Sequence, residues 1–461
     1  MKKSTALLLA SLMCFAAICA NACNISSTTE KQSWLQVVNS YENNKQSYIG
    51  AHGQPSTTAA SYATAKEMGL DFLFLTDDRS PLAFEMADQA GLKTIVSMKN
   101  TLYTYTGVDW RNDWSQYPIN IAVDYFDEPD VNYFERIAGW VDLHNEKYAE
   151  SKGANPLFWV NLLPLDTPDT GLSQGDDGLA VDETYINRYC RQVMSKIAGE
   201  PILSFDYYPL QARYKSGAVF DYNYVATGWL RSLELVAKYA KQYGVNSHAY
   251  IQTCGFYEPN PNANSWICRR VSEEDLRFQV YVSMAYGIRN FTHFTYTTST
   301  IKGYTQSCID KNGEKTELWY QAQAVNNEVH ELDHVFLSFD WMGTSSIIGT
   351  ENLHIDSEYR NAAFDRLEYG VDEFYGVTGV RATQDTIAGQ FYDSENDRYA
   401  LMLVNYTEPT DEKTNTVTVD VSEGARTSAV YKLGEWNEYS VTNGSVTLQL
   451  APGEGAFVLI I

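Results

Sequence analysis

Eight short β-rich runs, joined by longer segments with apolar residues at helical spacing, predict an α/β fold of the (β/α)8 TIM-barrel type, followed by an antiparallel β-sandwich. Strand and helix alternate eight times over about 290 residues, close to the usual length of such a barrel. The eight runs are Tyr48–His52, Phe72–Thr76, Thr94–Met98, Ile121–Phe126, Leu157–Leu163, Ile202–Tyr208, His248–Thr253 and Asn290–Tyr296.

The segments between these runs carry apolar residues three and four positions apart, which predicts amphipathic helices. They include Thr58–Met68, Val131–Glu150, Tyr185–Ile197, Ala226–Gln242 and Glu273–Tyr286. Glycines 69, 91, 244 and 287 stand where a helix would end before the next strand. We therefore expect the barrel to occupy residues 34–342.

Beyond Leu337 the pattern changes to short alternating segments separated by Asn, Asp and Gly. Ala400–Val404, Thr416–Val421 and Val446–Leu450 are examples. This pattern is typical of antiparallel strands and predicts a β-sandwich over residues 345–461.

The first 22 residues have the features of a secretory signal peptide. Two lysines precede the apolar run Ala6–Ile18, and Ala20-Asn21-Ala22 forms a small-residue cleavage site before Cys23. The run is shorter than the roughly 20 residues of a spanning helix. We expect an exported protein, secreted, periplasmic or anchored to the cell envelope by a lipid on Cys23, with a flexible tether over residues 23–33.

Composition limits the partners. A net charge of −24 argues against binding to nucleic acid or to anionic lipid. The 33 tyrosines and 10 tryptophans suit a surface that stacks against sugar rings, although buried core aromatics would also account for most of them.

Four cysteines remain after the leader: Cys190, Cys254, Cys268 and Cys308. Four cysteines allow three pairings, and sequence alone does not choose among them. A disulfide between Cys254 and Cys268 would close a short loop and is the preferred expectation, with buried free thiols as the alternative.

Active sites of such barrels lie at the carboxyl ends of the strands, so the polar residues that end each run are the candidates. For catalysis these are Asp127, Glu128 and Asp206. Residues expected to bind substrate are His52, Asp77, Asn161, Tyr207, Gln252 and Tyr296. Lone polar groups at strand ends, such as His52, Asn161 and Tyr296, also often serve only the packing of the core.

The fourth run ends in Asp127-Glu128-Pro129 and carries a resemblance to known enzymes. Retaining barrel glycosidases place Asn-Glu, often before proline, at this point, and the Glu is their acid/base. Barrel N-acetylhexosaminidases of families 20 and 123 place Asp-Glu there and use the substrate's own acetamido group. The resemblance implies a glycoside hydrolase acting on a β-linked glycan, with Glu128 as general acid and Asp127 as its partner.

Two further segments extend the resemblance. Met284–Phe291 with Phe294–Tyr296 resembles the last helix and strand of family 42 β-galactosidase relatives, and Leu450–Leu459 resembles the last hairpin of the small β-domain that follows many glycosidase barrels. Gln252 departs from the pattern, because retaining enzymes place a nucleophilic Glu at the end of the seventh strand. An amide cannot be that nucleophile.

Glycoside cleavage needs a proton donor for the leaving oxygen and a group that stabilises or traps the cationic sugar. With a 2-acetamido sugar, Asp127 would orient the acetamido group while its carbonyl oxygen attacks the anomeric carbon. In an inverting alternative Asp206 would activate water opposite Glu128, which requires roughly 6.5 to 9.5 Å between the carboxyl groups. The structural alternatives are a helix cap for Asp127-Glu128 before Val131 and a turn cap for Asp206 before Pro209.

Two other functions compete with this one. His330-Glu331-Leu332-Asp333-His334 matches the zinc motif H-E-x-x-H of metallopeptidases, although its place after the eighth strand also fits a solvated face of an outer helix. The missing Glu at Gln252 favours a barrel that binds glycans without cutting them. Glycoside cleavage itself requires no metal or organic cofactor.

Overall fold

The computed structural model describes residues 33–351 and 374–461, apart from residues 43, 150, 152, 154, 375, 424 and 426. The predicted signal peptide and all of the predicted tether except Ser33 lie outside the described residues. The chain divides into two compact units, residues 1–40 and 41–461. Helix α2 (Trp34–Val38) belongs to the first unit, and every element described below belongs to the second.

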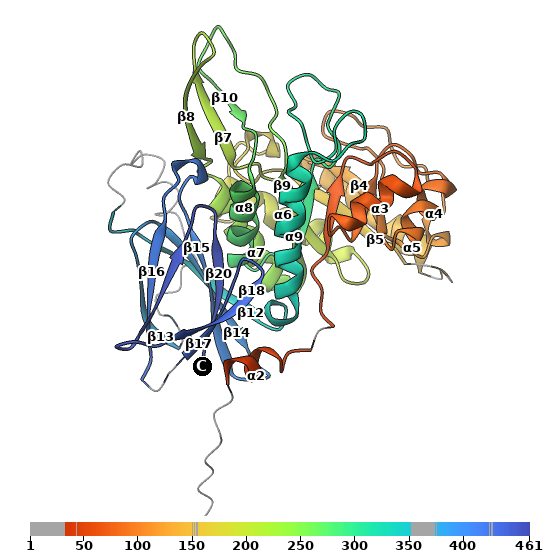
Figure 1. The fold of residues 1–461 in the computed structure, drawn as a ribbon. Helices are drawn as coiled ribbons and strands as arrows, with labels where there is room; N and C mark the ends of the chain where they lie inside the picture. The colour runs from red at the N-terminus through yellow and green to blue at the C-terminus, as the bar shows by residue number, and fades with distance from the viewer. Residues whose placement is uncertain are drawn as a thin grey trace, which may run out of the picture. The chain divides into compact units, whose positions relative to one another are not determined.

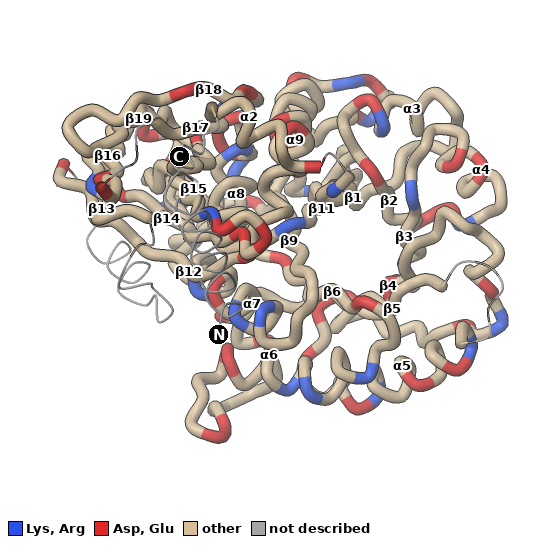
Figure 2. The backbone as a smooth tube through the Cα atoms, turned by 90° about the horizontal axis from the view of Figure 1, so that it is seen from below, with Lys and Arg blue, Asp and Glu red and all other residues tan. Residues whose placement is uncertain are grey.

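Eight parallel strands close into a barrel, which confirms the predicted fold class. Their order around the barrel is β1-β2-β3-β4-β5-β6-β9-β11, with β11 pairing back onto β1, and Figure 2 shows them arranged as a ring. Most of their residues are buried, as expected for parallel strands covered by helices. The strands are β1 (Ile49–His52), β2 (Phe72–Leu75), β3 (Lys93–Ser97), β4 (Asn120–Asp127), β5 (Leu157–Leu162), β6 (Ile202–Phe205), β9 (Asn246–Gln252) and β11 (Asn290–Phe294).

Helices connect the barrel strands. They are α3 (Ala59–Glu67), α4 (Pro81–Gln89), α5 (Phe134–Tyr148), α6 (Val181–Gln192), α7 (Trp229–Tyr243), α8 (Glu273–Ala285) and α9 (Glu317–Phe336). Several ends follow the sequence signals: α7 stops at Gly244, which has a φ of 65°, and Ser272 with Asp275 forms a capping box at the start of α8.

A small three-stranded antiparallel sheet departs from the regular alternation. Its strands are β7 (Leu210–Lys215), β8 (Val219–Val225) and β10 (Ser265–Cys268), in the order β10-β7-β8. It is formed by insertions after β6 and after β9, so it stands at the carboxyl end of the barrel strands, which we call the mouth (Figure 1). The sequence pattern did not predict it.

Two antiparallel sheets form the sandwich that follows the barrel. One has the order β12-β14-β15-β20-β17-β18 and the other β13-β16-β19, and aliphatic residues such as Leu403, Val419 and Leu448 fill the space between them. Helix α8 packs on β14, β15 and β20. The strands are β12 (Asp340–Ile347), β13 (Val377–Ala382), β14 (Thr386–Asp393), β15 (Arg398–Asn405), β16 (Asn415–Val421), β17 (Thr427–Lys432), β18 (Glu435–Ser440), β19 (Ser445–Leu450) and β20 (Gly455–Ile460).

The expected disulfide is absent. Cys190, Cys254, Cys268 and Cys308 are all buried free thiols, which corrects the preferred pairing in favour of its alternative. Cys254 and Cys268 pack in one apolar cluster with Phe256, so burial of apolar surface holds this loop together without a covalent link. Among the described helices, none combines the length and the apolar character that a membrane span requires.

Candidate active site

A β-bulge in β4 turns two acidic side chains toward the barrel interior. In the pairing of β4 with β5, Tyr125 is an extra residue between Asp124 and Phe126. Tyr125 and Phe126 therefore both point outward, and their rings pack against residues of α5. Without the bulge, Asp124 and Asp127 would face opposite sides of the strand, because neighbouring side chains alternate. With it, both acids lie on the inner face.

Glu128 follows β4 in the left-handed region, with a φ of 56°. This conformation is uncommon for a residue other than glycine and is often found at functional sites. Backbone N–H groups fix the turn: that of Asp127 donates to the carbonyl of Asn100, and that of Glu128 to the carbonyl of Asn161, both at 2.8 Å. The cap of the following helical turn is Asp130, whose carboxylate accepts an N–H at 2.8 Å. Asp127 and Glu128 are therefore not used as caps.

A chain of buried side chains holds Asp127 in place. The amide of Asn161 donates to Asp127 Oδ1 at 3.0 Å, and the hydroxyl of Ser204 donates to Asn161 Oδ1 at 2.9 Å. His248 contacts Ser204 through Nδ1 at 2.9 Å and Thr292 through Nε2 at 2.7 Å. These residues come from five successive barrel strands, so the barrel itself orients this carboxylate. Asn161 was expected to bind substrate, but its side chain forms these hydrogen bonds to Asp127 and Ser204 instead.

Asp206 follows β6 and reaches the side chain of Glu128. A hydrogen bond between the two carboxyl groups affects the pKa of both, and the nearby side chain of Tyr208 also influences the pKa of Asp206. Two carboxyl groups in direct contact cannot both ionise easily, so such a pair retains a proton. Oδ1 of Asp206 is buried and has no hydrogen-bonding partner among the described residues.

Burial raises the pKa of all three acids, and repulsion by neighbouring carboxylates adds to the rise for Glu128 and Asp206. Burial, followed by the charge of Asp127, raises the pKa of Glu128 from 4.5 to about 7, against the opposing effect of the Asp206 hydrogen bond. Burial and the charge of Glu128 raise the pKa of Asp206 well above its ordinary value. Burial raises the pKa of Asp127, and the Asn161 hydrogen bond opposes it. The cluster therefore holds exchangeable protons near neutral pH.

Asp124 is a fourth acid that the sequence interpretation did not single out. Burial, with a contribution from the charge of Asp127, raises its pKa to about 8, although a hydrogen bond from Ser97 and the charge of Arg79 oppose this. Its Oδ1 is buried without a hydrogen-bonding partner among the described residues. Asp124 is thus a neutral carboxylic acid beneath Asp127 at pH 7.

Two tyrosines that the sequence interpretation also missed face the acids. The charges of Asp206, Glu128 and Asp127 contribute to raising the pKa of Tyr208 and of Tyr250, after burial. Strand alternation contained the signal for Tyr208, because a side chain four positions from the inward-facing Ser204 lies on the same face.

A separate polar group lies at the ends of β1, β2 and β3. His52 packs between the rings of Phe74 and Phe294, at centroid distances of 5.7 and 5.6 Å. Burial lowers its pKa to about 4, so the ring is neutral at pH 7. Asp77 is exposed and forms an ion pair with Lys99 at 2.7 Å. His52 and Asp77 are near enough for the Asp77 charge to affect His52.

Three predicted substrate-binding residues do not join these groups. Tyr207 points away from the acids, and its hydroxyl donates to Asp166 at 2.9 Å. Tyr296 is fully buried near Trp319 of α9, and its hydroxyl has no hydrogen-bonding partner among the described residues. Both were placed at the mouth from their position at the end of a run. Tyr207 points outward because its neighbours Asp206 and Tyr208 face the acids, whereas Tyr296 follows the end of β11, and strand alternation from the inward-facing Thr292 does not account for its direction.

Gln252 is also fully buried, and backbone groups use its whole amide. Its Nε2 donates to the carbonyls of Leu210 and Arg269 at 3.1 and 2.8 Å, and its Oε1 accepts the N–H of Leu210 at 3.2 Å. The side chain therefore ties the β9 end to the small sheet instead of facing substrate.

The H-E-x-x-H sequence lies within α9, away from the mouth. Both ring nitrogens of His330 have partners: Nε2 with the carbonyl of Gly69 at 2.9 Å and Nδ1 with Asp333 at 3.3 Å. The contact with Gly69 ties α9 to the turn after α3. In the part of the chain that the structure describes, no cluster of three or more His, Cys, Asp or Glu side chains could hold a metal ion.

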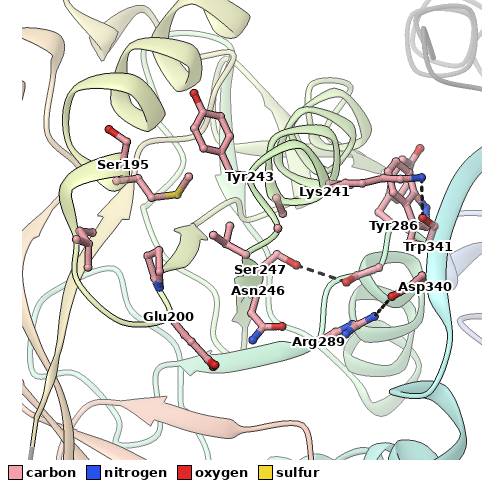
Figure 3. A pocket seen from close by; sticks show the side chains of 18 of the residues that line it. Ser195, Glu200, Lys241, Tyr243, Asn246, Ser247, Tyr286, Arg289, Asp340 and Trp341 are labelled. Atoms are coloured by element: carbon pink, nitrogen blue, oxygen red, sulfur yellow. Dashed lines mark hydrogen bonds and ion pairs between the residues drawn. The ribbon is translucent and has the colours of Figure 1, made fainter.

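A large pocket lies at the opposite end of the barrel, where the strands begin (Figure 3). Its volume is about 1120 Å³, and its lining includes Asn246, Ser247, Lys241, Arg289 and Trp341. Both cations are already engaged, Lys241 with the carbonyl of Trp341 at 3.1 Å and Arg289 with the carbonyl of Phe339 at 2.9 Å. It contains none of the clustered carboxyl groups, so the acid site at the mouth remains the candidate for chemistry.

Comparison with known proteins found remote similarity to solved structures. No family model matches the chain, and no curated protein matches it. A putative alpha-galactosidase/melibiase from Bacteroides fragilis is similar at a TM-score of 0.46 and 9% identity, covering 90% of this chain and 79% of that one. A noncanonic maltogenic alpha-amylase from Thermotoga neapolitana is similar at a TM-score of 0.44 and 9% identity, covering 91% and 100%.

A GH30 endoxylanase from Clostridium papyrosolvens is similar at a TM-score of 0.39 and 10% identity, covering 91% of this chain and 97% of that one. These structures are named as an endoxylanase, an alpha-amylase and a putative alpha-galactosidase/melibiase, and their similarity to this chain is remote. The activity of this chain must follow from its own site.

Proposed function

We propose that the protein is an exported glycoside hydrolase that cleaves a β-linked glycan, with Glu128 as general acid and Asp127 as its partner. One observation carries the proposal: Glu128 stands in a left-handed conformation at the mouth, in contact with two other acids, and its pKa is raised to about 7. An acid that is half protonated near neutral pH is suited to protonate a leaving oxygen.

In this mechanism the glycosidic oxygen accepts the proton of Glu128 as the bond to the anomeric carbon breaks. Asp206, joined to Glu128 by a hydrogen bond, positions that carboxyl group and keeps a proton within its reach. An inverting reaction would need roughly 6.5 to 9.5 Å between the acid and base carboxyl groups for a water molecule. The direct contact of Asp206 with Glu128 therefore favours a role in positioning over a role as water-activating base.

Asp127 supplies the second function. The hydrogen bond from Asn161 fixes its carboxylate beside Glu128. With a 2-acetamido sugar, Asp127 would accept the acetamido N–H, while the acetamido carbonyl oxygen attacks the anomeric carbon. This route needs no nucleophilic Glu on the seventh strand, which agrees with the structural use of Gln252. The leader sequence supports action outside the cytoplasm.

The test is Glu128→Gln, assayed on glycans with poor alkoxide leaving groups and on activated aryl glycosides. The amide keeps the shape but cannot donate the proton, so turnover of the natural type of substrate should fall about 10² to 10⁴-fold and turnover of the aryl glycoside much less. Asp127→Asn should lower both. Glu146→Gln, an exposed acid on α5, is the matched control. Wild-type turnover by Glu128→Gln on a glycan would refute the assignment.

A second candidate, glycan binding without cleavage, is favoured by the absence of a carboxylate at Gln252. The same substrates separate the two functions. A chain that binds oligosaccharides but releases no reducing ends at any pH between 4 and 9 would support binding alone.

A further inference from the structure

The small β7-β8-β10 sheet presents a face that continues from the acid site. Its strand register places Trp266 of β10 opposite Arg213 of β7, and Cys268 opposite Gln211. Directly opposed residues of antiparallel strands point to the same face, and so do residues two apart on one strand. Trp266, Arg213, Cys268 and Gln211 therefore share one face, which we call the wall.

Contacts at the base of the wall show that it faces the mouth. Cys268 packs in a cluster with Phe256, Tyr208 and Phe294, and its sulfur lies 4.0 Å from the carbonyl of Tyr208. The amide of Gln211 donates to the same carbonyl at 3.4 Å. Tyr208 lies near enough to the acids for the charges of Asp206, Glu128 and Asp127 to raise its pKa, after burial. The wall therefore begins beside the acid cluster, and Figure 1 shows the small sheet projecting from the barrel.

Aromatic side chains connect the wall to the acids. Trp266 is 51% exposed, and its ring meets that of Tyr257 edge-on at 5.6 Å. Tyr257 is 57% exposed and held in the left-handed region at a φ of 72°. The charges of Glu128 and Asp206 act on its hydroxyl. Exposed indole and phenol rings offer flat apolar faces on which sugar rings can stack.

Arg213 is half-buried on this face, and its side chain forms no hydrogen bond or ion pair with the residues that the structure describes. Acidic residues outnumber basic ones 58 to 34 in this chain. Other little-exposed arginines have carboxylate partners, as Arg269 has in Asp275 and Arg277 in Glu328. A guanidinium is a planar fork that matches a carboxylate or a sulfate in two parallel hydrogen bonds.

We propose that the wall binds an anionic sugar unit of the glycan, with Arg213 paired to its carboxylate or sulfate and Trp266 stacked on the sugar chain. This inference rests on the proposed function and names its substrate class. A substrate with negative charge would be repelled by the acid cluster and by the net charge of −24. A cation placed beside the cluster offsets this repulsion and fixes which unit of the chain lies over Glu128.

The experiment measures binding by calorimetry in the Glu128→Gln background, so that cleavage is not required. The probes are a galacturonic acid hexasaccharide, which carries carboxylates only, a κ-carrageenan hexasaccharide, which carries sulfates only, and the neutral hexasaccharides of glucose and of N-acetylglucosamine. At least one anionic probe should bind more tightly than the neutral ones. Arg213→Gln should weaken that binding about 10- to 100-fold and change neutral binding less than about twofold. Whether the galacturonate or the sulfated probe responds distinguishes a carboxylate from a sulfate.

Two variants serve as controls. Arg213→Lys keeps the charge but loses the fork, so its loss of affinity should be intermediate. Lys93→Gln changes the net charge equally at the start of β3, at the opposite end of the barrel, and should leave all affinities unchanged. Thermal unfolding of each variant checks that the fold is intact.

Trp266→Ala should weaken anionic and neutral probes alike, because stacking does not depend on charge. Equal binding of anionic and neutral probes, or an unchanged anionic affinity in Arg213→Gln, would overturn the inference. If the wild-type protein then cleaves a neutral glycan, the proposed glycosidase function stands although the wall does not bind an anionic sugar. Tight anionic binding without cleavage would instead overturn the proposed function alone.

Discussion

The pH dependence of cleavage should report the raised pKa of Glu128. The mechanism needs this carboxyl group protonated, so activity is fully present below its pKa and is lost as the pH rises through about 7. About 99% of the groups would be protonated at pH 5, half at pH 7 and about 1% at pH 9. If Glu128 had its ordinary pKa of 4.5, the ratio of its protonated to its ionised form at any given pH would be about 300-fold lower than with a pKa of about 7.

The change that tests this reasoning is Asp127→Asn. The charge of Asp127 is the second largest cause of the raised Glu128 pKa, after burial. Removing it should move the alkaline limb of kcat/KM down by about one pH unit, which corresponds to about 1.4 kcal/mol. Because Glu128 and Asp206 share a hydrogen bond, the limb belongs to the pair and not to one residue.

The assay is the initial rate of cleavage of an unactivated oligosaccharide between pH 4 and 10, in wild type and in Asp127→Asn. An activated aryl glycoside is the internal control, since its good leaving group needs little protonation and its alkaline limb should be shallower. A wild-type limb below about pH 5.5 would show that burial does not hold the proton on Glu128. A limb that stays in place in Asp127→Asn would show that the two charges do not interact.

Two further predictions concern buried groups. The pKa of Asp124 is about 8 in the folded state and 3.8 ordinarily, so between these pH values the folded state binds one more proton than the unfolded state and the stability falls as the pH rises. In urea unfolding, Asp124→Asn should therefore be more stable than wild type by about 2 kcal/mol or more at pH 8 and by much less at pH 4. An equal difference in stability at the two pH values would contradict the raised pKa. Gln252→Glu should not supply a nucleophile, and it should lower the free energy of unfolding by about 1 to 3 kcal/mol in the same assay, because a carboxylate has no donor for the carbonyls of Leu210 and Arg269. Faster cleavage by this variant would contradict the structural role of Gln252.

The sequence by itself determined the barrel and the main acids. Runs such as Phe72–Thr76 are short and apolar, as buried strands are, and their regular alternation with segments of helical spacing allows few other folds. Because parallel strands end at one edge, Asp127, Glu128 and Asp206 could be assigned to a common site before any coordinates were considered. The pairing of acids was therefore readable from local pattern and topology together.

Only the tertiary structure decided how those acids are aimed. The extra residue Tyr125 in β4 and the left-handed backbone of Glu128 are consequences of the register with β5, and no local sequence signal specifies a register. The same holds for Gln252, whose amide is used by backbone groups of the inserted sheet. A side chain's partners are set by residues far apart in the chain, so the direction of each acid, and its pKa, appear only when the strands have paired.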